Sequence, residues 1–118
     1  MSYVNNFQCC GFLAREPETR YDGEGRPRTI FVVALNNPRK KNPSYIDCIL
    51  WGEQGVRFVD LCTKGTEVYL QGEVETSVFT DSLGSRHKVT TLVVEKWSAS
   101  KSTKDPSLLR IPKPKLAE

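Results

Sequence analysis

The 118-residue chain has little of the chemistry that metal centres and redox sites need. It holds one histidine, His87, and four cysteines without a Cys-x-x-Cys pair, so a zinc site is poorly supported. The neighbours Cys9 and Cys10 would point to opposite faces of a strand, so they cannot serve one buried cluster. Free, mostly buried thiols in a reducing compartment are the favoured interpretation; a disulfide comes second and redox catalysis a distant third.

Catalytic and membrane motifs are also scarce. The sequence shows no activated nucleophile, no paired carboxylates and no phosphate-cradling loop, which predicts a protein that is not an enzyme and uses no cofactor or metal. No apolar run approaches the ~20 residues needed to span a bilayer, and the first residues lack the features of a secretory signal. We therefore expect a single domain that stays where it is made, in the cytoplasm.

The net charge of +3 is unevenly distributed along the chain. Residues 1–97 hold twelve Lys and Arg against twelve Asp and Glu, so the whole excess lies from Ser98 onward. A neutral body argues against DNA binding that is purely electrostatic. Any contact with nucleic acid would need stacking as well as local clusters of basic residues.

Residues 45–51 (YIDCILW) alternate in the way a half-buried strand does. One set of alternate side chains is wholly apolar, which predicts a face that lies against a core. The other set carries Tyr45 and Trp51 on either side of Asp47. Phe79 likewise falls on the polar face of a later strand. These aromatic side chains are poorly placed for packing and well placed to meet a flat ligand.

Alternation elsewhere predicts an all-β domain over residues 1–97. Five strands are expected, over residues 3–15, 29–36, 45–51, 66–79 and 87–97. Helical spacing that stops at Lys64-Gly65 predicts one short helix over residues 53–62, between the third and fourth strands. This order matches a small closed five-stranded barrel of the OB type. A sandwich fits less well, because it needs no helix at that place.

The remaining segments are predicted as connections. Residues 16–28 contain two prolines and two glycines, which predicts a loop. Gly11 and Gly72 interrupt strand patterns and predict a bulge or bend. Residues 98–118 are rich in Ser, Lys and Pro without periodicity, which predicts a flexible, basic C-terminal tail.

Several blocks of residues, in order and nearly without gaps, match a known family. The blocks are Asn5-Asn6…Gly11-Phe12-Leu13…Glu16-Pro17-Glu18…Arg20-Tyr21, Phe31…Ala34…Asn36, Tyr45 to Gly52, Lys64-Gly65…Val68 to Val74, and Thr76…Phe79-Thr80-Asp81…Gly84…Thr90-Thr91…Val93-Val94. On these residues the chain resembles bacterial-type single-stranded DNA-binding proteins, the SSB family. The resemblance covers roughly residues 5 to 97.

In that family, bases stack on aromatic side chains spread over the sheet and its hairpins. Carried over by position, the resemblance assigns this role to Tyr45, Trp51 and Phe79, the residues that alternation places on the outer face. A further family aromatic falls near Arg39, where this chain has none, so one stacking contact differs. The Arg39 guanidinium could stack in its place or pair with a phosphate.

Basic residues close to these aromatics are the expected phosphate contacts. They are Arg20, Arg26 and Arg28 in the first loop, Arg39, Lys40 and Lys41 in the hairpin, and Arg86 and Lys88 after the turn. His87, which lies between the last two, is a further candidate for a phosphate contact, and no special chemistry is assigned to it.

The resemblance implies sequence-independent binding of single-stranded DNA, which protects the strand in bacterial replication, recombination or repair. It also implies a homo-oligomer, a tetramer first and a dimer second, in the nucleoid-associated cytoplasm. The family typically ends in an acidic tip that recruits other proteins, whereas this chain ends in a basic tail. Docking of replication and repair partners is therefore not carried over, and a version encoded on a plasmid, phage or mobile element fits the tail.

Three alternatives stay open. A primosome-type OB adaptor would act mainly through protein partners and bind DNA weakly. An OB module for RNA would prefer a ribose 2′-hydroxyl. A structural or interaction protein that has lost its DNA surface is disfavoured, because the three aromatics are retained.

Overall fold

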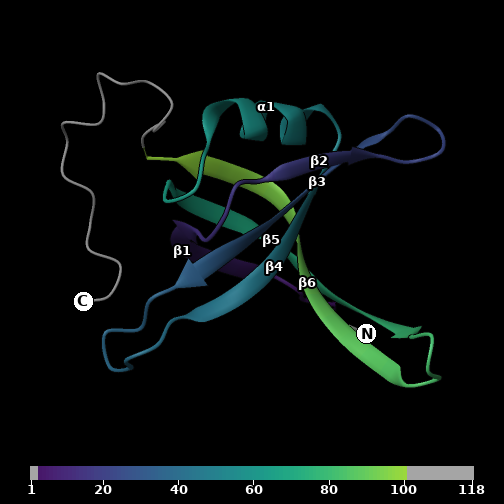
Figure 1. Ribbon diagram of the computed structural model, residues 1–118. Helices are drawn as coiled ribbons and strands as arrows, with labels where there is room; N and C mark the ends of the chain where they lie inside the picture. The colour runs from purple at the N-terminus through teal and green to yellow at the C-terminus, as the bar shows by residue number, and fades with distance from the viewer. Residues whose placement is uncertain (1–2, 101–118) are drawn as a thin grey trace.

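The computed structural model of the protein describes residues 3–100 (Figure 1). Its elements are β1 (Phe7–Leu13), β2 (Glu18–Tyr21), β3 (Pro27–Leu35), β4 (Ser44–Trp51), α1 (Glu53–Leu61), β5 (Glu67–Thr80) and β6 (Arg86–Ala99). The strands form one sheet in the order β1-β5-β6-β4-β3-β2, and an additional β1–β3 pairing joins its two sides into a near-closed ring. The predicted OB-type barrel is thereby confirmed.

The segment predicted as a loop over residues 16–28 is instead a β-hairpin. Strand β2 pairs with β3 from Glu18 opposite Ile30 to Tyr21 opposite Pro27. One carboxylate oxygen of Asp22 accepts hydrogen bonds from two backbone N–H groups of the turn, and Gly25 takes a left-handed conformation with φ of 84°. The turn-forming residues that predicted a loop therefore connect two paired strands. The sheet of the described residues has six strands instead of the five expected.

Helix α1 lies where it was expected and closes one end of the barrel (Figure 1). Its Phe58 is fully buried and stacks on Phe31 of β3, with ring centroids 4.4 Å apart. Trp97 of β6 meets the same ring edge-on at 5.0 Å. Burying a Phe side chain stabilises a fold by about 1.5–3 kcal/mol, so this aromatic cluster anchors the helix to the sheet.

The cysteines divide between the core and the surface. Cys48 and Cys62 are buried in the apolar core, Cys9 is half-buried and Cys10 is exposed. Burial raises the pKa of the Cys48 and Cys9 thiols, since a thiolate is disfavoured away from water. Those two thiols therefore stay protonated at neutral pH and act as small apolar side chains.

Strands β5 and β6 run beyond the barrel as a two-stranded arm (Figure 1). The register of their pairing shifts between Gln71 and Gly72, and a side chain on Gly72 would collide with the backbone of Val93. Beyond this bulge the pairs continue out to Thr80 opposite Arg86 while burial falls away. We call residues 75–91 the β5–β6 arm.

The ends of the described chain differ slightly from expectation. The first strand begins at Phe7, and the last reaches Ala99, so Ser98 and Ala99 belong to β6. The rest of the predicted flexible tail, residues 101–118, lies outside the described residues. Within residues 3–100, no helix combines the length and apolar character needed to cross a membrane.

Candidate nucleic-acid interface

The outer face of β4 carries the first two candidate stacking residues. Cys48 and Leu50 point into the core, so Tyr45, Asp47 and Trp51 point away from it. Tyr45 is 65% exposed and Trp51 42% exposed, which is unusual for side chains of this size. Large ring surfaces on a paired strand give a rigid face that a base could cover.

Arginine side chains surround Trp51. Arg28 lies directly opposite Trp51 on β3, and Arg20 lies opposite Arg28 on β2, so the three share one row of the outer face. The guanidinium carbons of Arg26 and Arg28 lie 5.4 and 6.0 Å from the centroid of the Trp51 ring. A cation at this distance is attracted by the ring electrons. Trp51 is therefore held in a basic setting, which suits an anionic strand.

Two of these arginines already have acidic partners. Arg20 Nε donates to Glu18 at 2.7 Å, and Arg26 Nε donates to Asp22 at 2.8 Å. The Arg20 hydrogen bond lowers the pKa of Glu18, and the backbone and side chain of Arg26 lower that of Asp22. Arg28 makes no ion pair with any described residue, so of these three arginines its charge is the most available to a phosphate.

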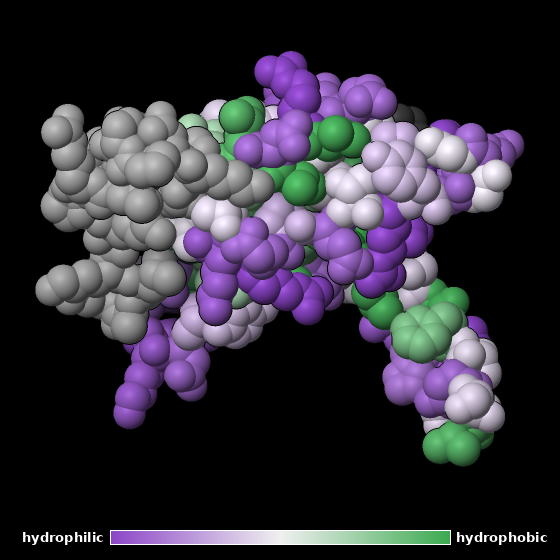
Figure 2. Space-filling model, turned by 45° about the horizontal axis from the view of Figure 1, so that its top comes forward, coloured by the Kyte–Doolittle hydropathy of each residue, from purple (hydrophilic) through white to green (hydrophobic). Residues whose placement is uncertain are grey.

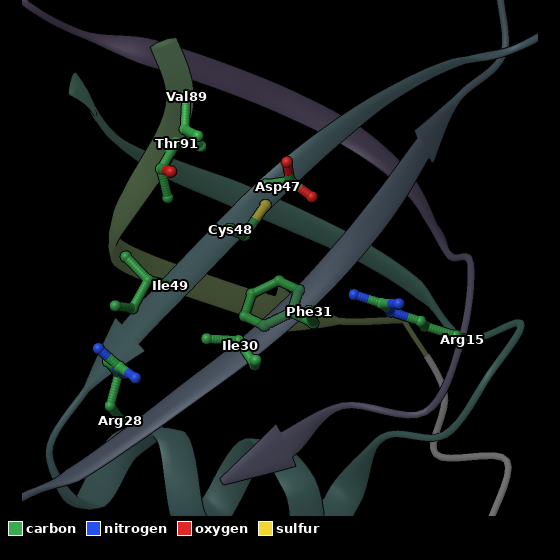
Figure 3. Close-up of a pocket in the computed structure, with 9 residues that line it drawn as sticks. All are labelled: Arg15, Arg28, Ile30, Phe31, Asp47, Cys48, Ile49, Val89 and Thr91. Atoms are coloured by element: carbon green, nitrogen blue, oxygen red, sulfur yellow. The ribbon is translucent and has the colours of Figure 1, made fainter. Parts of the chain in front are cut away.

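A cavity of about 240 Å³ opens beside this row and is shown in Figure 3. Arg28 stands at one side of the cavity and Arg15 at the other, with Ile30 and Phe31 between them. Asp47 also lines the cavity, and its negative charge would repel a phosphate at that point. Phosphates are therefore best accommodated at the basic rims, and bases in the middle.

Tyr45 lines a second cavity, of about 250 Å³, at the other end of β4. Lys41 and Lys64 line the same cavity, together with apolar groups that include Phe12 and Pro43. In the sequence, Lys64 belongs to the predicted helix stop and to one of the family blocks, and Arg15 ends the first predicted strand. No local sequence pattern predicts that either residue lines a cavity, because the end of β1 and the α1–β5 connection come close to the outer face only in the folded chain.

The β3–β4 loop places the other two basic residues of its triplet at the surface. Arg39 and Lys40 are exposed, and neither lines the cavity below Tyr45. The backbone N–H of Arg39 donates to the side chain of Asn37 at 2.9 Å, and that of Lys40 to its carbonyl. The loop tip is therefore an ordered turn that presents cations next to the outer face.

The third candidate stacking residue lies on the β5–β6 arm. Phe79 is 51% exposed and pairs across the arm with His87, whose ring stacks on it. Arg86 and Lys88 are the strand neighbours of His87, so they point to the reverse face of the arm. The structure thus gathers basic residues around Trp51 and Tyr45, but it separates Arg86 and Lys88 from the Phe79 face.

Comparisons with known proteins show a family for most of the chain. Residues 4–100 match the model of the Single-strand binding protein family. The chain is 29% identical over 104 residues to a single-stranded DNA-binding protein of Lactiplantibacillus plantarum, an alignment that covers 84% of this chain and 52% of that protein. It is 33% identical over 95 residues to a single-stranded DNA-binding protein of Treponema pallidum, covering 75% of this chain and 54% of the relative.

A third relative gives the same result. The single-stranded DNA-binding protein of Clostridium perfringens is 30% identical over 96 residues, which cover 80% of this chain and 64% of that protein. The chain thus spans about half to two-thirds of the length of these relatives. Because the family match extends over nearly every described residue, the chain belongs to the single-strand binding protein family.

Proposed function

We propose that this protein binds single-stranded DNA without sequence preference and without catalysis, and so protects it in replication, recombination or repair. The observation that carries the proposal is the exposure of Tyr45, Trp51 and Phe79 on the outer face, while the apolar side chains of the barrel turn inward. Exposed aromatic side chains of this size are unusual on a folded surface, and a ligand that stacks on them accounts for their exposure.

The expected mechanism combines stacking with charge neutralisation. Every base presents a flat π-face, so stacking on Tyr, Trp or Phe tolerates any sequence and contributes about 1–3 kcal/mol per base. Basic side chains along the path neutralise phosphates and release counterions, which makes the affinity fall as salt rises. Bases inside a duplex cannot reach the rings, so duplex DNA should compete poorly.

We further infer that the protein acts as a homo-oligomer, a tetramer or else a dimer. Strand β1 pairs with β5 from Phe7 to Phe12 and with β3 only at Phe12 and Leu13. Over Phe7–Gly11, its other edge has no strand partner among the described residues, and such an edge is open to pairing with a second copy. Light scattering after size-exclusion chromatography distinguishes a monomer from either assembly.

The setting of the protein follows from its relatives. The three similar proteins described above come from bacteria, so we place this one in the bacterial cytoplasm. The three exposed rings disfavour an adaptor role, and the names of the relatives favour DNA over RNA as the ligand. A matched RNA oligomer, titrated in parallel with DNA, tests the second of these.

The test is a titration of oligo-dT followed by tryptophan fluorescence at several salt concentrations, with a matched duplex as control. Trp97 packs against Phe58 and supplies a background signal, so quenching should come mainly from Trp51. Trp51→Phe keeps a ring and removes the reporter, whereas Trp51→Ala removes both. The proposal requires tight binding by the wild type and by Trp51→Phe, measured by anisotropy, and it fails if no single strand binds.

A further inference from the structure

The ring of His87 is built into the surface that carries Phe79. The two rings stack with centroids 5.0 Å apart and an angle of 22° between their planes. The pair is directly cross-strand in the β5–β6 arm, so the contact is set by the register rather than by chance rotamers. The His87 side chain is still 47% exposed. It therefore braces Phe79 and also presents ring surface of its own.

Asp81 fixes the orientation of this imidazole. His87 Nε2 lies 2.7 Å from Asp81 Oδ2. The other carboxylate oxygen accepts hydrogen bonds from the backbone N–H groups of Leu83 and Ser85, both at 2.9 Å, so the acid is itself locked to the turn. The hydrogen bond from His87, followed by that from Ser85, lowers the pKa of Asp81. The Asp81 carboxylate thus stays ionised throughout the pH range in which a histidine changes charge.

The hydrogen bond to Asp81 determines which nitrogen of the His87 ring remains available to a ligand. An ionised carboxylate can only accept a hydrogen bond, so Nε2 of His87 must carry the proton that it shares with Asp81. Nδ1 is then unprotonated in the neutral ring and gains a proton when the ring is charged. The free nitrogen changes from an acceptor, which a phosphate repels, to a charged donor, which a phosphate attracts.

Other charged groups near His87 do not share this behaviour. Along the same face of the arm, the next pair is Ser77 with Val89, and Glu75 follows opposite Thr91. On the reverse face, Arg86 and Lys88 flank His87. Glu, Arg and Lys side chains do not normally change charge between pH 5 and 8, whereas a histidine does.

We propose that His87 is a DNA-contact residue that completes the Phe79 platform and makes the affinity for single-stranded DNA depend on pH. The inference rests on the proposed function and assigns this residue a role in it. At low pH the protonated ring braces Phe79, stays bound to Asp81 through Nε2 and offers Nδ1–H to a phosphate oxygen. Binding of DNA then takes up a proton, so affinity rises as pH falls from 8 to 5.5.

The first test uses the wild-type protein and its single histidine. The Hε1 resonance of His87 can be assigned without ambiguity, because the chain has no other histidine. Its titration midpoint should move to higher pH when saturating oligo-dT is added, since a strand that prefers the charged ring must stabilise it. An unchanged or lower midpoint in the complex overturns the proposal, and no mutant has to fold for this result.

The second test measures oligo-dT affinity by anisotropy at pH 5.5, 6.5, 7.5 and 8.5 and constant ionic strength. Wild-type affinity should increase about two- to five-fold toward pH 5.5, as expected for one exposed charge pair. His87→Phe keeps the stack and should lose this increase while retaining the affinity seen at pH 8.5. His87→Ala should bind more weakly at every pH and also show no increase.

Two further variants sharpen the result. Asp81→Asn retains an acceptor for the turn but loses the negative charge, so the inflection should move to lower pH. Lys96→Gln removes a cation from β6 opposite Gln71, away from the arm, and should leave the pH profile unchanged. If His87→Phe keeps the wild-type profile, the proposal is wrong while DNA binding stands. If the wild type binds no single strand at any pH, the proposed function itself has failed.

Discussion

The barrel and the β5–β6 arm hold their exposed aromatics in different ways. Trp51 ends a strand that is paired along β3, over a core that includes Phe31 and Phe58. Phe79 stands on a two-stranded hairpin with no core beneath it, and it is braced by His87 instead. Two strands alone are marginally stable in water. An exposed ring can therefore be supported by a core or by a neighbouring ring, and this protein shows both arrangements.

Stability should separate the two regions most strongly. Phe58→Ala removes a buried ring and should cost about 3–5 kcal/mol in the free energy of unfolding. Val78→Ala on the arm, where the side chain is 54% exposed, should change it by less than about 0.5 kcal/mol. Urea unfolding measures both. Comparable losses would mean that the arm has a packed interior of its own.

Affinity should show the next largest difference. Trp51→Ala should weaken oligo-dT binding by about 1–3 kcal/mol, roughly 5- to 150-fold, because the ring is fixed by the barrel and flanked by arginines. Phe79→Ala should weaken it less, since a braced ring on an arm is held less firmly. Anisotropy titrations of both single variants and the double variant test this order. A larger loss for Phe79→Ala would place the main binding surface on the arm.

The salt dependence should distinguish free from paired arginines. Arg28→Gln should lower the slope of log affinity against log salt by about 1, as expected for one lost phosphate contact. Arg20→Gln should lower it less, because Arg20 is already bonded to Glu18. Equal effects would show that DNA displaces Glu18 from Arg20.

The smallest expected effect is a change of thermal stability with pH at the β2–β3 turn. The lowered pKa of Asp22 gives stability that is fully present above about pH 4, where the unfolded chain is ionised, and that is lost as pH falls through the folded pKa. Asp22→Asn should therefore unfold at a slightly lower temperature than the wild type at pH 7. The difference should shrink as pH falls through the folded pKa of Asp22. A difference that does not change with pH would point to the turn hydrogen bonds rather than to charge.

Much of the barrel could be predicted from alternation. The inward and outward faces of β4, the helix after it and the buried Leu92 and Val94 follow directly from the spacing of apolar residues. Strand β2 could not be predicted in the same way, because its four residues gain their stability from pairing with β3 and are surrounded by turn-forming residues. The local composition therefore predicts the turn between β2 and β3 but not the pairing of the two strands.

The site shows the same limit. Alternation places Tyr45, Trp51 and Phe79 outside, but Val78 shares the parity of the buried Leu70 and is nevertheless exposed. The strand leaves the core beyond Gly72, and parity no longer implies burial there. Likewise, the pairing of Phe79 with His87, which leaves Arg86 on the reverse face, depends on the β5–β6 register, and the pattern of a single strand does not contain that register.

The bulge at Gln71 and Gly72 also has a consequence for the speed of capture. From Glu75 to Thr80 the arm extends five residues, or about 17 Å at ~3.3 Å per residue. Figure 2 shows it standing clear of the barrel, with apolar surface near the tip, where Leu83 is 90% exposed. A diffusing strand can therefore meet the protein well before it reaches Trp51. Because Phe79 stands on the arm, shortening the arm should speed dissociation as well as slow association.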